Sequence, residues 1–85
     1  MEIGPDNLLD APLQISINSV AILLKEWCNR NTRKPECVMV GETLFRQLVC
    51  MFNGEKITVV TNRSSPIVEL TIIKGNVLSN YIIVV

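Results

Sequence analysis

The sequence predicts an α+β fold: two helices packed on a small, mostly antiparallel sheet, in the order α-β-α-β-β-β after an extended N-terminal arm. Two stretches before residue 55 have the apolar spacing of helices, and the remainder is rich in short β-type runs. The 85 residues suffice for one core, and with 48% apolar but only 5% aromatic residues that core must be aliphatic. We therefore expect an arm at residues 1–14 and a single domain at 15–85.

The arm holds two prolines around Leu8, Leu9 and Leu13. Proline removes a backbone donor and biases the preceding residue away from helical geometry. We expect an extended segment that lays these leucines on a neighbouring surface, with disorder in the free protein as the alternative.

The first helix is expected to begin near Ser16, because apolar residues then recur at helical spacing. These residues are Ile17, Val20, Ala21, Leu24, Trp27 and Cys28. Ser16 or Asn18 is suited to cap the first turn. Ile22 and Leu23 widen the apolar stripe, which predicts that the helix is covered on more than one face. The asparagines before Pro35 are suited to a left-handed stop.

The stretch "ECVMVG" predicts a short buried strand that Gly41 closes. A second helical pattern follows in "ETLFRQLVCMFNG". Its shared apolar face contains Leu44, Phe45, Leu48, Val49 and Phe52. Asn53 and Gly54 supply a left-handed stop to this helix.

The last third of the chain predicts three strands, at residues 57–60, 67–73 and 81–85, separated by polar turns. In the middle one, Val68, Leu70 and Ile72 fall on one side. The closing "YIIVV" must pair inside a sheet, because an exposed edge of this composition would promote aggregation.

Composition excludes several classes of function. Eight basic and eight acidic residues leave no net charge to attract nucleic acid or an anionic membrane. Cys28, Cys37 and Cys50 are odd in number, lack CxxC spacing and have no histidine to complete a zinc site. We interpret them as small buried apolar residues in a reducing compartment. We expect a protein without metal or cofactor that is soluble and intracellular, or assembled inside something larger.

Catalytic patterns are equally scarce. With no histidine, the candidate bases are scattered carboxylates and lysines, and no glycine-rich phosphate motif is present. Glu36 and Glu42 lie at strand and helix boundaries, where capping or a solvated role is the ordinary explanation. An enzyme would need a site assembled across an oligomer from Glu36, Glu42 and Lys34, so we expect a protein that is not an enzyme and works by contact.

The basic turn at residues 30–34 is either a solvated loop at a helix C-terminus or a contact for a phosphate or an acidic partner. We expect partner contacts from the arm, from this turn and from a C-terminal strand that offers an apolar sheet edge for strand addition. The candidate residues are Leu8, Leu9, Leu13, Arg30, Arg33, Lys34, Tyr81, Ile83 and Val85. The partners would be proteins, in a homo-oligomer or a larger assembly.

The passages "TRKPECVMVGETLFRQLV" and "IVELTIIKGNVLSNYIIVV" resemble the axial-domain region of HK97-fold major capsid proteins of tailed phages and of the related encapsulins. The likeness in element order covers residues 17–85. It implies a phage-like virion structural or assembly protein, an accessory, decoration or capsid-related component found in the virion or the host cytoplasm. The chain has no room for the family's spine helix and extended loop, so it would bind a lattice and not tile one.

A second hypothesis is a small regulatory inhibitor that binds a host or defence protein. In this case the acids of the arm, Glu2, Asp6 and Asp10, would mimic nucleic-acid charge. Neutralising them without loss of partner binding would remove this hypothesis.

Overall fold

The computed structural model describes residues 7–11, 14–31, 33–62, 66–78 and 81–85, and these form an α+β fold with two helices and a five-stranded mixed sheet. The helices are α1 (Ile17–Arg30) and α2 (Glu42–Met51). The strands are β1 (Leu8–Asp10), β2 (Cys37–Val40), β3 (Lys56–Val60), β4 (Ile67–Lys74) and β5 (Tyr81–Val84). The predicted fold class and the order of the later elements are confirmed.

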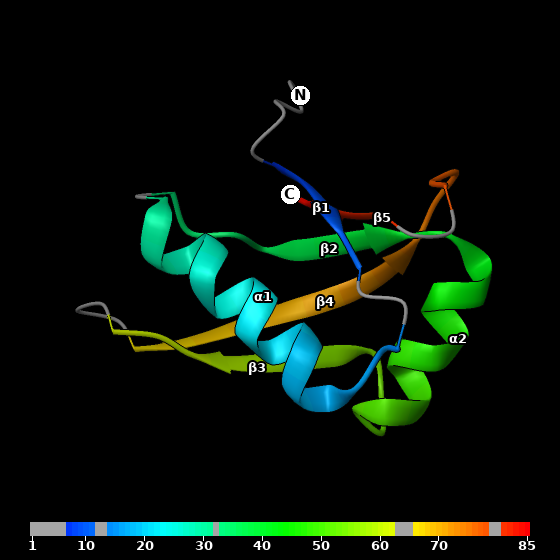
Figure 1. Cartoon of the computed structure of the whole chain (residues 1–85), viewed down its shortest axis with the longest axis horizontal. Helices are drawn as coiled ribbons and strands as arrows, with labels where there is room; N and C mark the ends of the chain where they lie inside the picture. Colours follow the sequence, from blue (N-terminus) through cyan, green and yellow to red (C-terminus); the bar gives the residue numbers. More distant parts are fainter. Residues whose placement is uncertain (1–6, 12–13, 32, 63–65, 79–80) are drawn as a thin grey trace.

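The strands are arranged in the order β1-β5-β2-β4-β3 (Figure 1). Only the central pair, β2 and β4, is parallel, and the other three pairings are antiparallel. After α2 the chain runs back through β3, opposite to β2, and the hairpin between β3 and β4 then turns β4 into the direction of β2. β1 and β3 form the two edges of the sheet.

The hydrophobic core lies between both helices and one face of the sheet. Strands alternate buried and accessible residues, so a single face carries the core side chains. From the sheet these include Val38, Ile57, Leu70 and Ile82, each fully buried. They form one cluster with residues of α1 and α2, so both helices cover the same face. Figure 1 shows α1 lying along the sheet and α2 near the end to which the arrows of β2 and β4 point.

Helix α1 begins with a capping box. The Ser16 hydroxyl accepts a bond from the Ser19 backbone N–H at 3.1 Å, and the Ser19 hydroxyl accepts one from the Ser16 N–H at 2.9 Å. The predicted Ser16 cap is therefore confirmed. At the other end Asn31 caps the helix with extended backbone geometry, φ −108°, so the expected left-handed stop is wrong there. The side-chain amide of Asn31 donates to the Trp27 backbone carbonyl at 2.9 Å.

The expected two-sided cover of α1 is wrong at Ile22. Its side chain is 56% exposed because it lies on the side of the helix turned away from the sheet, whereas Leu23 packs against the core. Helix α2 ends as predicted, with positive φ values at Asn53 (54°) and Gly54 (152°).

The segment that we expected as an extended arm is extended at its centre, and there it belongs to the sheet of the domain. Leu8–Asp10 is a strand of the sheet that pairs with β5, and the Asn7 amide donates to the Val84 carbonyl at 2.8 Å. β5 therefore lies between β1 and β2, and the C-terminal strand does not offer the open edge that we expected. The physical reason is that the arm supplies, within the same chain, the strand that β5 needs. Leu13 lies outside the described residues.

Candidate protein-contact surface

The face of the sheet opposite the helices carries an apolar row that crosses four strands. Cross-strand partners are Leu8 with Ile83, Ile83 with Met39, and Met39 with Ile73. All four residues lie on the accessible side of their strands, and among the described residues no helix covers this face. We call Leu8, Ile83, Met39 and Ile73 the apolar row.

Local structure explains why these side chains gather. Leu8 alternates with Leu9, which is buried at 8% exposure, so the strand turns Leu8 (44% exposed) to the open face. Met39 lies over Gly75, where any Cβ would meet its Sδ atom at 2.5 Å. Glycine at position 75 thus leaves free the space that the Met39 thioether occupies. Methionine is adaptable in such positions because its side chain is unbranched and polarizable.

Polar groups border the apolar row. The Lys56 ammonium and the Glu69 carboxylate form an exposed ion pair at 3.0 Å on the same face. Thr71 lies between the row and this pair, and Asp10 follows Leu8 opposite Tyr81. An apolar centre with a polar border is the usual composition of a protein interface.

The structure brings only some of the sequence-predicted contacts together. Leu8 and Ile83, expected on separate contact segments, are direct cross-strand partners. Tyr81 is half-buried beside Asp10, and Leu9 belongs to the core. Val85 is held by Cys37, whose carbonyl accepts its N–H at 2.9 Å.

The basic turn lies apart from the row. Arg33 is placed over the ring of the buried Trp27, 5.9 Å from the guanidinium carbon to the centroid, so its charge contacts the protein itself. Arg30 occupies the last turn of α1, where the helix dipole favours a cation. Lys34 is exposed.

Met39 and Ile73 were not among the predicted contacts. The stretch "CVMV" is apolar at every position, so alternation could not separate its two faces. The sequence of β4 does indicate that Ile73 is accessible. Glu69 and Thr71 are polar and lie on the accessible side of the strand, and Ile73 is the next residue on that side.

The cysteines differ in environment. Cys28 is buried, Cys37 is half-buried and Cys50 is exposed, so the expectation of three buried cysteines is wrong for Cys50. Burial, and to a lesser extent the Glu36 carboxylate, raise the pKa of the Cys37 thiol. Among the described residues no three potential ligands gather at a candidate metal site.

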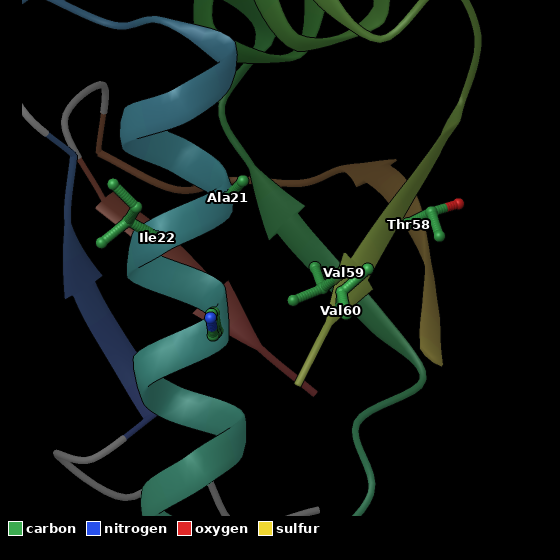
Figure 2. Close-up of a pocket in the computed structure, with 6 residues that line it drawn as sticks. Ala21, Ile22, Thr58, Val59 and Val60 are labelled. Atoms are coloured by element: carbon green, nitrogen blue, oxygen red, sulfur yellow. The ribbon is translucent and has the colours of Figure 1, made fainter. Parts of the chain in front are cut away.

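A second surface feature is a cleft of about 280 Å³ between α1 and the edge strand β3. It is lined by Ala21, Ile22 and Lys25 of the helix and by Thr58, Val59 and Val60 of the strand. Figure 2 shows Ala21 and Val59 directed toward the gap from either side and Thr58 directed away from the helix.

Comparisons with protein-family models, with curated proteins and with solved structures give no match. Neither helix in the described part of the chain is long and apolar enough to span a membrane.

Proposed function

We propose that this chain is a structural or assembly protein that acts through protein–protein contacts, and that the apolar row is its contact surface. The observation that carries the proposal is the row itself: four apolar side chains brought into register on the sheet face that no described helix covers. Contiguous apolar groups with a polar border favour a partner that removes them from water.

The finer proposal is a virion accessory, decoration or capsid-related component. It is supported by the sequence resemblance of residues 32–49 and 67–85 to the axial-domain region of HK97-fold proteins. A lattice-binding protein needs a broad docking face, and the five-stranded sheet leaves one face uncovered by the described helices. In this role no residue performs chemistry.

The test compares complexes of tagged variants isolated from the cells that produce the protein. Leu8→Glu places a charge in the row at its most exposed position, and we expect it to release the bound partner because a buried, unpaired carboxylate is costly. Gln47→Glu is the matched control, since Gln47 is exposed on α2, away from the row. Full retention of the complex by Leu8→Glu, with folding intact by circular dichroism, contradicts the proposal.

The same complexes distinguish assembly from inhibition. An assembly component predicts many copies in a large particle, whereas the inhibitor hypothesis predicts a small complex of fixed ratio. Mass photometry of the purified complexes measures this directly.

A further inference from the structure

We propose that the open edge of β3 binds a second copy of this chain, strand to antiparallel strand, across a two-fold axis at Thr58. This contact is separate from the apolar row: it joins two sheets edge to edge and leaves the open face uncovered.

The hydrogen-bond phase of the hairpin shows which backbone groups of β3 face outward. The Ile72 N–H donates to the Glu55 carbonyl at 2.8 Å, and the Thr61 N–H donates to the Pro66 carbonyl. Bonded positions alternate along an antiparallel pair, so Ile57 and Val59, between these two bonds, also turn their N–H and C=O groups toward β4. The intervening residues Lys56, Thr58 and Val60 turn theirs to the edge.

The two edges of the sheet differ in how they are protected. β1 is three residues long and carries Asp10 on its exposed side. β3 is five residues long, and after Lys56 it contains only Ile, Thr and Val, which have high β propensity. Natural edge strands are usually shortened, charged or covered, so the sequence of β3 is typical of a strand that acquires a neighbour.

Charge and symmetry select a second copy in one register. With the two-fold axis at Thr58, Lys56 faces Val60 of the second copy, and all outward backbone groups of the three residues are paired. The two Lys56 side chains are then about 14 Å apart along the strands, beyond the screening length at physiological salt. Each is also neutralised by its own Glu69 at 3.0 Å. Among the β3 side chains, no like charges therefore meet at the junction. Lys25 is the charged residue that lines the adjacent cleft of each copy.

The adjacent cleft provides a second layer to the contact. Because α1 lies beside β3, joining two edges brings the cleft of each copy to the junction, where Ala21 and Val59 are directed toward the gap (Figure 2). The interface is still narrow, since it consists of one five-residue strand and the flank of one helix. Contacts of less than about 1,200 Å² in total are usually reversible, so we expect a dimer that forms with increasing protein concentration.

Disulfide trapping tests this geometry. Thr58→Cys in a background of Cys37→Ser and Cys50→Ser would place the introduced thiols on directly opposed residues, about 5.5 Å apart at Cα. Cys37 is replaced because it is the cross-strand neighbour of Thr71, the control position. This distance lies within the range of about 4.4–6.8 Å found in disulfides. Thr71→Cys in the same background is the control, because Thr71 is exposed on the same face but belongs to an interior strand.

We expect rapid covalent dimer formation for Thr58→Cys under mild oxidation and little for Thr71→Cys. Equal or faster dimer formation by Thr71→Cys would place the junction on the open face and overturn the proposal. A chain that stays monomeric in analytical ultracentrifugation at all accessible concentrations would also overturn it.

A proline variant tests the backbone bond itself. Thr58→Pro removes an outward N–H without breaking the ladder to β4, whereas Thr58→Val retains the donor and the side-chain volume. We expect dimerisation at least about tenfold weaker for the proline variant and unchanged for the valine variant. If Thr58→Pro alters the circular dichroism spectrum, the disulfide trapping of Thr58→Cys against Thr71→Cys becomes the deciding test of the junction. A foreign strand as the true occupant would appear as a monomeric chain that captures peptide at this edge.

Discussion

At the scale of single residues, two glycines decide how closely segments approach. At Gly41 a Cβ would meet the Val77 carbonyl oxygen at 2.6 Å, whereas at Gly75 it would meet the Met39 side chain. The φ of −71° at Gly41 suits any residue, so the constraint there is contact with backbone and not dihedral strain. Sequence reasoning identified Gly41 as the end of a strand, but the approach of residue 77 depends on tertiary structure.

We predict that Gly41→Ala destabilises the fold more than Gly75→Ala. Backbone at residue 77 must move in the first variant, at a cost of about 2 kcal/mol, whereas the flexible Met39 chain can shift in the second. Urea unfolding of both variants measures the difference. An equal or reversed order would show that the loop at residue 77 yields more easily than Met39.

The cysteines predict an order of chemical reactivity. Thiolate is the reactive form, so the raised pKa and partial burial of Cys37 should make it alkylate more slowly than exposed Cys50, and buried Cys28 should be the slowest. Glu36→Gln removes a negative charge beside Cys37, lowers the pKa of that thiol and should speed its alkylation near pH 8. Mass-resolved iodoacetamide labelling measures the alkylation rate of each cysteine. An unchanged rate at Cys37 in the Glu36→Gln variant would contradict the electrostatic effect of the Glu36 carboxylate on this thiol.

At the scale of elements, local signals predicted most of the fold. Helical spacing and the Ser16 cap located α1, and the β-branched runs located the strands from β2 onward. β1 was missed because Leu8–Asp10 is too short to show alternation, and its strand structure depends on pairing with β5. The same long-range pairing hid the apolar row, since Leu8 and Ile83 lie 75 positions apart in the chain.

The capping box gives a prediction at this scale. Ser16→Ala removes the acceptor for the Ser19 N–H and should lower the free energy of unfolding by about 1 kcal/mol. Asn18→Ala is the control, because Asn18 is exposed and makes no cap bond in the described structure. Thermal unfolding should show a loss only for the first variant, and a similar loss in both would assign the effect to the first turn in general.

At the scale of the whole molecule, one face of the sheet holds the core and the other carries the proposed contacts. This division follows from two helices packing on a single side, which leaves the apolar row without cover among the described residues. The resemblance to HK97-fold proteins stays a prediction, as does the placement in a virion. Neither is needed for the claim that the row binds protein.

Site-specific photocrosslinking tests that central claim most directly. A photoreactive amino acid replaces Met39, at the centre of the row, or Gln47, on the exposed side of α2. Irradiation in the producing cells, followed by mass spectrometry of the linked peptides, identifies what lies against each position. The account predicts a single dominant protein adduct at position 39 that Leu8→Glu abolishes, and none at 47. Adducts at 47 alone, or adducts at 39 that persist in Leu8→Glu, would contradict it.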